Sequence, residues 1–526
     1  LTDPEGWNND TRPALQNLTD AIIYELHIRD FSIYPNSGIK NKGKYLAFTE
    51  PDTNIDGIAT GVAHLRELGI THLHILPGFD FRSIDESQPE SNAYNWGYDP
   101  QNYNVPEGSY ATDAENGEVR IREFKEMVMS LHNNGFRVIM DVVYNHTGAT
   151  KDSNFNQLYP GYYYRLTEDG KFSNASACGN ETASEKPMMR KFMLESIRHW
   201  IEEYHIDGFR FDLMGIHDLE TMNLIAEEVR KIDPTILLYG EGWTAGDCML
   251  EESKRAVKAN TLKMPAIAVF SDEIRDGIKG HWSDHLDKGF VSSKADSEES
   301  VKFGIVGATD HTGVDFTKVN YAKKARANGP WQTINYVACH DDMTLFDKLK
   351  ESTGKTGKEL EAMHLLANTI VLTSQGIPFL HAGADFLRTK YGNSNSYQSP
   401  DSINQLDWDR KRQYVKINEH YRKLIAMRKE HPVFRLKTSE EIQQRLEFTH
   451  DTGMLIAYTL DGTNLQEESW DKVYVIFNGS DQAKQVNLPS GEWKTVLNNS
   501  VFYGDRIVSE NMTIEPSAAV ILRQNL

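Results

Sequence analysis

The sequence predicts an α/β protein: a (β/α)8 barrel, or TIM barrel, followed by a small antiparallel β-sandwich. Three observations support this prediction. Apolar strand-like runs alternate with helical patterns eight times within residues 21–431. Several of these runs stay apolar almost to their last residue, as parallel strands buried on both faces do. From residue 432 onward, short strand-like runs separated by Gly, Asp and Asn turns replace the helices.

The predicted elements alternate along the chain, except that no helix is expected between strands 236–243 and 262–270. The expected strands are 21–28, 70–77, 136–146, 206–215, 236–243, 262–270, 333–342 and 376–386. The expected helices are 60–69, 119–135, 187–204, 217–232, 272–280, 357–373 and 411–430. Three further stretches are polar and are expected to be loops: 82–118, 285–330 and 388–410.

The pattern also predicts how the chain divides into domains. Residues 1–20 are polar and turn-rich, which indicates a leading arm or linker. Residues 21–431 form the predicted barrel, and 432–526 form the predicted sandwich. Within the barrel, 147–186 is a polar excursion too long for an ordinary connection, so we expect a functional loop or a small subdomain.

Composition narrows the classes of partner. The 526 residues carry a formal net charge of -20, which argues against nucleic acid or an anionic membrane as a partner and favours a neutral one. No apolar run reaches the roughly 18 residues that a membrane span needs. Cys178, Cys248 and Cys339 are odd in number and form no CxxC pair, which argues against a disulfide scaffold or a cysteine-ligated zinc site.

Four of the predicted strands end in polar side chains. In a barrel, the C-terminal ends of the strands meet at one face, where the active site is built. A purely structural origin is disfavoured because buried acids without partners are costly. The residues at these four strand ends are Asp141, Asn145, His146, Arg210, Asp212, Glu241, His340, Asp341 and Asp342.

The acids among these residues fit retaining glycoside hydrolysis, which needs a nucleophile and an acid/base. Arg210 and Asp212 are two residues apart, so they lie on one side of their strand. A neighbouring cation keeps a carboxylate ionised, which makes Asp212 the candidate nucleophile. Glu241 has no cation adjacent in sequence, so we expect a raised pKa and the acid/base role. Asp341 is then free to stabilise positive charge in the transition state.

The sequence does not predict a metal site. No HExxH motif exists, and His72 and His74 lie within a predicted strand, where packing is the simpler interpretation. DTNIDG, at 52–57, matches the first half of an EF-hand loop, but the twelfth position is Ala63 instead of Glu. We therefore expect no required cofactor and name no metal ligand, and we leave open whether calcium binds at this loop or elsewhere.

Four motifs carry a resemblance to a known family. DVVYNH, GFRFDLMG, GEGW and YVACHDD are similar, in order and in strand placement, to the signature regions of the α-amylase family of glycoside hydrolases. The resemblance implies that Asp212 is the nucleophile, Glu241 the acid/base and Asp341 the transition-state stabiliser. It also implies that four further residues line the subsite at the cleavage point: Asp141, His146, Arg210 and His340.

A fifth motif narrows the resemblance. YNWGYDP, at 94–100, resembles the hallmark of type I pullulanases, which cut α-1,6 branches in α-glucans. It implies that Tyr98 stacks under the sugar at the cleavage point. Further substrate contacts are expected from Trp96, Trp243, Asp401 and Asn404.

Two departures from that group are visible. Asp342 stands where the group usually has Asn, and its charge is expected to raise the pKa of one carboxyl of the Asp341–Asp342 pair. TDPEGW, at 2–7, resembles the junction that follows an upstream β-sandwich module, so we expect such a module to be missing from this chain.

Alternatives remain at this stage: an α-1,4-acting amylase or neopullulanase, a branching enzyme, and a catalytically silent α-glucan-binding protein. The α-glucan is the expected partner, and we expect a monomer. A polymeric substrate favours a secreted or cell-envelope location over a cytoplasmic one.

Overall fold

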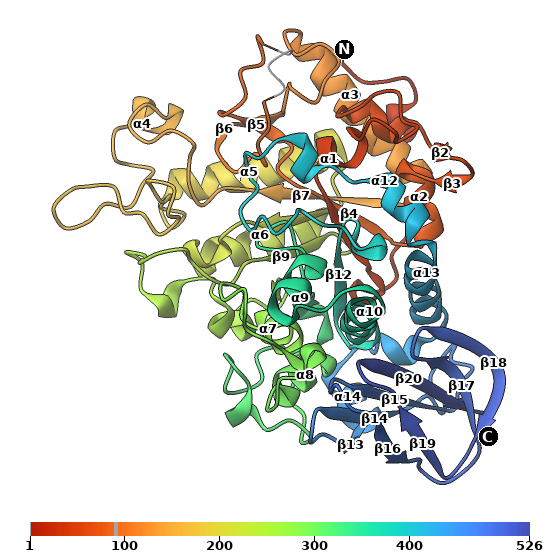
Figure 1. Cartoon of the computed structure of the whole chain (residues 1–526). Coiled ribbons are helices and arrows are strands. Elements are labelled where there is room, and N and C mark those ends of the chain that lie inside the picture. The colour runs from red at the N-terminus through yellow and green to blue at the C-terminus, as the bar shows by residue number, and fades with distance from the viewer. Residues whose placement is uncertain (1, 89–92, 526) are drawn as a thin grey trace. The chain divides into compact units, whose positions relative to one another are not determined.

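The computed structural model describes residues 2–88 and 93–525 (Figure 1). Residues 1, 89–92 and 526 lie outside this description, so it omits one end of the predicted arm and part of the predicted loop 82–118. Eight strands form a closed barrel in the order β1-β12-β11-β10-β9-β8-β7-β4, which confirms the predicted fold class. They are β1 (Ile23–Leu26), β4 (His72–Ile75), β7 (Arg137–Val142), β8 (Gly208–Phe211), β9 (Leu237–Gly240), β10 (Ala268–Phe270), β11 (Thr333–Asn335) and β12 (Ile377–His381).

The chain forms two compact units, and each is described by itself. The first contains residues 1–18, 23–270 and 396–408. The second contains 19–22, 271–395 and 409–526. The domain boundaries at residues 20 and 431 that the sequence suggested therefore stay predictions.

The strands of the first unit set up the site by their register. Neighbouring strands from β1 through β4, β7, β8 and β9 to β10 pair in parallel. Asp141 on β7 pairs with Arg210 on β8, and Arg210 pairs with Tyr239 on β9. The strand register therefore places polar residues from three separate parts of the sequence side by side on adjacent strands.

Helices of the first unit begin and end where the sequence provides caps. They are α1 (Ile28–Ser32), α2 (Gly61–Leu68), α3 (Gly117–Asn133), α4 (Asn154–Leu158), α5 (Pro187–Tyr204), α6 (Leu219–Ile232) and α11 (Asp401–Asn404). Pro187 opens α5 at a position that needs no N–H donor, and the left-handed His205 closes it. The Asp218 side chain accepts from Thr221 N and so caps α6. Helix α5 matches its predicted bounds residue for residue.

Residues 1–18 of the predicted arm belong to the first unit and carry a buried charged cluster. The two ring nitrogens of His132 lie 2.7 Å from Asp10 Oδ2 and 2.8 Å from Asp207 Oδ2. His205 Nδ1 lies 2.8 Å from Asp10 Oδ2, and its ring stacks on Trp7 at 4.1 Å. Burial alone lowers the pKa of His132, but hydrogen bonds to the two carboxylates raise it to about 9. A charged His132 thus holds the arm on the barrel.

Two of the predicted polar segments of the first unit contain regular structure. Strand β6 (Pro100–Pro106) lies in the predicted loop 82–118 and pairs with β5 (Phe79–Phe81). Outside the predicted elements, β2 (Asn54–Ile55) pairs with β3 (Ile58–Ala59). Within 147–186 the structure has α4 and two isolated antiparallel bridges, Tyr164 with Thr182 and Leu166 with Phe172. Isolated bridges leave no run of alternating residues, so no strand pattern was visible in the sequence.

The second unit supplies the remaining barrel strands and more helices than predicted. These are α7 (Asp272–Lys279), α8 (Glu298–Ile305), α9 (Leu345–Thr353), α10 (Gly357–Thr373), α13 (Val415–Glu430) and α14 (Ser439–Arg445), while α12 (Trp408–Gln413) starts at the last residue of the first unit. Helix α8 lies inside the predicted loop 285–330, and the predicted helix 411–430 is interrupted at Tyr414. The first part of the predicted strand 262–270 is wrong, since Lys258–Lys263 is a 3-10 helix.

The C-terminal strands form a six-stranded antiparallel sheet and a separate two-stranded one. They are β13 (Leu446–His450), β14 (Leu455–Asp461), β15 (Lys472–Asn478), β16 (Lys484–Asn487), β17 (Trp493–Asn498), β18 (Val501–Val508), β19 (Asn511–Ile514) and β20 (Ala518–Gln524). Val486 and Ile514 of the small sheet share one core with Trp493 and Val520 of the large one. The two layers thus pack as a small sandwich. In the described part of the chain, no helix is both long and apolar enough to span a membrane.

Candidate active site

Arg210 is the centre of the polar cluster at the strand ends of the first unit. Its side chain is only 2% exposed. Nη1 donates to Asp141 Oδ1 and to Asp212 Oδ1, each at 2.9 Å. Nη2 lies 2.6 Å from Glu241 Oε1. Burial alone would lower the pKa of Arg210, but the surrounding carboxylates raise it, so one charged guanidinium holds three acids from β7, β8 and β9.

Asp212 is held by a second donor. Asn145 Nδ2 donates to Asp212 Oδ2 at 2.7 Å and to the Asp212 carbonyl at 2.9 Å. Asp212 is 8% exposed, so a small part of it remains accessible. Charge-assisted hydrogen bonds from Arg210 and Asn145 favour the ionised form of this carboxylate. This is the state that the predicted nucleophile requires.

Glu241 differs from what the sequence suggested. The expectation of a site without a neighbouring cation is wrong, because Arg210 Nη2 is in ion-pair contact with its carboxylate. The Leu213 backbone N–H also donates to Glu241 Oε2 at 3.0 Å. Both contacts favour the charged form. Adjacency in sequence could not reveal them, because they come from 28 or more positions earlier in the chain.

The local backbone conformation directs the Leu213 N–H toward Glu241. Leu213 has a φ of 38°, a left-handed conformation that is costly for a residue with a branched side chain. At Gly215 a Cβ would lie 2.5 Å from the Trp243 carbonyl oxygen, so glycine allows the turn to approach the end of β9. Trp243 itself is half-buried, with its ring 6.4 Å from that of Phe270.

Asp141 is fully buried and belongs to a chain of contacts. It accepts from the Tyr98 hydroxyl at 2.7 Å, and His74 Nε2 lies 3.0 Å from the same oxygen. Burial and the nearby Asp141 raise the pKa of Tyr98, so its hydroxyl stays protonated and can donate. The Tyr98 ring lies 5.6 Å from the Arg210 guanidinium. YNWGYDP and the strand ends thus converge on one cluster.

Two members of this cluster were missed. His74 was assigned to strand packing, yet it contacts Asp141. Glu25 on β1 pairs in register with His74, and its Oε1 lies 4.0 Å from His74 Nδ1. The sequence did contain an indication of this contact, because Glu25 is a carboxylate within the mostly apolar run 21–28. A carboxylate in a buried strand needs a buried partner.

His146 has protein partners on both ring nitrogens. Nδ1 lies 2.6 Å from Asn145 Oδ1, and Nε2 lies 2.8 Å from the Tyr98 carbonyl oxygen. Burial lowers its pKa to about 4, so the ring is neutral near pH 7. In this arrangement His146 positions Asn145 and Tyr98, and a direct bond to a sugar hydroxyl would have to replace one of these contacts.

Three other predicted substrate contacts have structural partners in the first unit. Trp96 is buried against Leu76 and Tyr94. Both Asp401 oxygens accept from Arg29, each at 2.7 Å. Asn404 is fully buried and bonds to Ser396 and Ser399. These contacts hold the segment 396–404, and the predicted roles in substrate binding stay predictions.

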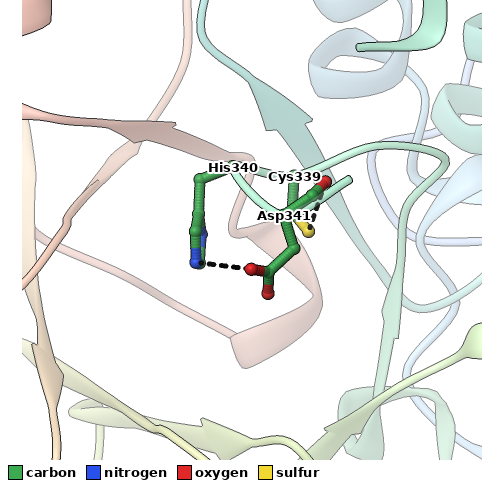
Figure 2. Close-up of side chains that lie close together, drawn as sticks. All are labelled: Cys339, His340 and Asp341. Carbon is green, nitrogen blue, oxygen red and sulfur yellow. Dashed lines mark hydrogen bonds and ion pairs between the residues drawn. The ribbon is translucent and has the colours of Figure 1, made fainter. Parts of the chain in front are cut away.

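His340, Asp341 and Asp342 lie in the second unit, in the turn that follows β11. His340 is buried, and its Nε2 lies 3.5 Å from Asp341 Oδ1 (Figure 2). The Asp341 side chain is 46% exposed. Burial raises the pKa of Asp342, and the charge of Asp341 raises it further, while Lys279 opposes the shift. Asp342 has a φ of 62°, a conformation in which Asn and Asp are the side chains best tolerated after glycine.

One acidic group resembles a cation site in the first unit. Oxygens of Asp80, Glu86 and Glu107 all lie within 4.8 Å of one another. Arg120 pairs with Asp80 at 3.5 Å and also with Glu86, so a guanidinium already compensates two of the three charges. This acidic group therefore does not support calcium binding, which the sequence had left undecided.

Two family models match the chain. Residues 32–171 match the α-amylase catalytic domain, and residues 394–517 match the C-terminal region of pullulanase-type α-1,6-glucosidases. With the closed barrel and its ring of acids, these matches define the class as an α-amylase-type barrel glycosidase.

Individual relatives narrow the class. The Bacillus subtilis pullulanase is 42% identical over 92% of this chain, and chloroplastic pullulanase 1 of Arabidopsis thaliana is 33% identical over 86%. The chain spans 66% and 58% of the lengths of these two curated relatives. The solved pullulanase of Paenibacillus barengoltzii, in complex with maltohexaose and α-cyclodextrin, is 46% identical with a TM-score of 0.92, covering all of this chain and 80% of the other. The chain belongs to the pullulanase family.

Proposed function

We propose that the protein hydrolyses α-1,6 branch linkages in pullulan and in dextrins derived from amylopectin or glycogen, with retention of anomeric configuration. The observation that carries this proposal is the bonding of Asp141, Asp212 and Glu241 to the single guanidinium of Arg210. Asp212 and Glu241 contact the two terminal nitrogens of one guanidinium, which is compatible with the carboxyl separation of about 5 Å that the double-displacement reaction needs.

In the proposed reaction Asp212 attacks the anomeric carbon of the glucosyl unit. Glu241 gives its proton to the departing 6-oxygen, and the covalent glucosyl ester on Asp212 is then hydrolysed by water that Glu241 deprotonates. Because Arg210 and Leu213 N–H favour ionised Glu241, substrate binding has to weaken these contacts before the proton is transferred. Asp341 is proposed to stabilise the oxocarbenium-like charge.

Specificity for the branch rests on the YNWGYDP segment. The Tyr98 hydroxyl is tied to Asp141, and its ring lies against Arg210, which fixes the ring beside the reacting carboxylates. A ring fixed in this way offers a flat apolar surface to the sugar at the cleavage point. The binding of maltohexaose by the P. barengoltzii relative supports an α-glucan as the substrate here.

Product analysis tests this proposal. The protein is incubated with pullulan and, separately, with unbranched amylose, in the presence of EDTA because the proposed chemistry needs no metal. Maltotriose from pullulan and intact amylose are expected. Panose from pullulan, or shortened amylose, would mean that the enzyme cuts α-1,4 bonds. Binding of both glucans without any product would mean a silent binder.

A further inference from the structure

A thiol, an imidazole and a carboxylate meet in the turn after β11, within the second unit. The ligand atoms of Cys339, His340 and Asp341 all lie within 4.8 Å of one another (Figure 2). Cys339 Sγ folds back to 3.9 Å from the Asp341 carbonyl oxygen. Sulfur, nitrogen and oxygen donors of three consecutive residues therefore lie close together, although they match no spaced metal-binding motif.

This donor set suits a borderline divalent cation such as Zn²⁺, which takes three protein ligands and a water in tetrahedral geometry. Around such an ion the ligand atoms are about 3.3–3.8 Å apart. His340 Nε2 and Asp341 Oδ1, 3.5 Å apart, already fit this range, and the distances to the sulfur, which are at most 4.8 Å, have to contract by no more than about 1.5 Å. Cys339 and Asp341 can supply this movement because both are partly exposed, whereas His340 is fixed by burial.

We propose that Cys339, His340 and Asp341 form a binding site for Zn²⁺-class cations that blocks catalysis when it is filled. On coordination the Cys339 thiol loses its proton to solvent as the metal–sulfur bond forms, and no electron is transferred. His340 and Asp341 would then be occupied by the metal. The inhibitory consequence rests on the proposed function, in which these two residues serve the glucan, whereas the binding itself does not.

Neighbouring charges set the strength of this site. Lys279 is buried and interacts electrostatically with Asp342 and Cys339, and Lys390 Nζ donates to the His340 carbonyl at 3.2 Å. Two nearby ammonium groups oppose a cation, while the charge of Asp342 partly offsets them. The site should therefore bind more weakly than a structural zinc site and release its ion to a chelator.

The other two thiols provide matched controls. Cys248 Sγ lies near Arg165 and Glu181, and burial raises the pKa of Cys178 to about 11. Within the described ranges, neither belongs to a group of three metal-binding side chains. Replacement of either by serine should therefore leave the cation site intact.

The first experiment measures metal binding by a method that does not depend on enzyme activity. Co²⁺ is added to the intact, metal-free protein, and a thiolate-to-cobalt charge-transfer band is recorded. One equivalent of Co²⁺ should saturate the band, which should persist in Cys178→Ser and Cys248→Ser and disappear in Cys339→Ser. If Cys339→Ser fails to fold, Cys339→Ala replaces it. Absence of the band in the wild type, or its persistence without the Cys339 thiol, would overturn the proposal.

The second experiment reads inhibition. Zn²⁺ is titrated into each variant, and its activity on pullulan is expressed relative to the same variant in EDTA. The activity of the wild type should fall at least about tenfold with Zn²⁺ and return when excess EDTA is added. Glucan should protect the wild type against this inhibition. Cys339→Ser should need at least about tenfold more Zn²⁺ for the same degree of inhibition. Equal sensitivity of the two proteins would contradict the proposal. Inactivity of every variant in EDTA would count against the proposed function, and the cobalt band would still decide the metal site.

Discussion

The candidate catalytic residues of the two units are held in opposite ways. In the first unit, Asp141, Asp212 and Glu241 are buried, share Arg210, and each accept at least one further hydrogen bond. In the second unit, Asp341 is nearly half exposed and contacts His340 at 3.5 Å. The first group is preorganised at the cost of burying several charges, whereas the second can move. Function and folding should therefore be coupled in the first unit and separable in the second.

The largest loss of activity should follow from removing the reacting carboxylates. Asp212→Asn and Glu241→Gln keep the side-chain shape but can neither attack nor transfer the proton, so kcat on pullulan should fall by about 10⁴-fold or more. Both proteins should still unfold cooperatively in a thermal melt. Near-normal activity in either variant would remove that residue from the mechanism.

Arg210→Met should be the next most damaging change, and it should lower both the stability and the catalytic activity. It leaves three buried carboxylates without their shared cation, which should cost about 3–5 kcal/mol of unfolding free energy and about 10³-fold in kcat. Urea unfolding and pullulan hydrolysis measure the two effects. Arg66→Met is the control, because the Arg66–Asp52 pair is exposed and should cost no more than about 1 kcal/mol. Similar losses in both variants would contradict the idea of a coupled network.

Asp341→Asn tests the other side of the comparison. Removing one stabilising charge should lower kcat by about 10²-fold. Because the side chain is 46% exposed, the unfolding free energy should change by no more than about 0.5 kcal/mol. A loss of stability as large as that of Arg210→Met would mean that the second unit is as tightly organised as the first.

The smallest effect on activity should come from the His132 cluster. The pKa of His132 is about 9 in the folded protein and about 6.5 when unfolded, so its contribution is fully present below pH 6.5. It is lost as the pH rises through 9, which should remove about 3 kcal/mol of unfolding free energy. Unfolding measured from pH 6 to 10 gives this slope, and His132→Gln should flatten it. An equal slope in both proteins would show that other groups control alkaline unfolding.

The barrel could be predicted because each strand carries its own local signal. Apolar runs at regular intervals, and helices such as 187–204 with a proline at the start, need no knowledge of distant residues. Helix α8 was missed because polar residues around it resemble a loop. Strand β6 was missed because Pro stands at both of its ends and Asn102 and Asn104 lie between them, although Phe79–Phe81 provides a pairing partner.

Several residues of the polar cluster around Arg210 could be located from the sequence, but the contacts that set their charge states could not. Residues at strand ends, such as Asp212 and Glu241, follow from barrel geometry alone. The cation beside Glu241 was not visible, because Arg210 is 31 positions away and reaches it across neighbouring strands. Asn404 was assigned to substrate binding on resemblance, but in the fold its side-chain amide is hydrogen-bonded to Ser396 and Ser399.

The return of residues 396–408 to the first unit has a consequence for synthesis on the ribosome. Arg29 donates to both oxygens of Asp401, and the Trp408 indole N–H donates to the Phe31 carbonyl at 3.1 Å. In each pair the second residue is translated more than 370 residues after the first. The nascent first unit therefore emerges incomplete and stays so while 271–395 is translated. A shortened gene that stops before codon 396 would encode a polypeptide lacking its own closing segment, and we expect such a product to accumulate as insoluble aggregate.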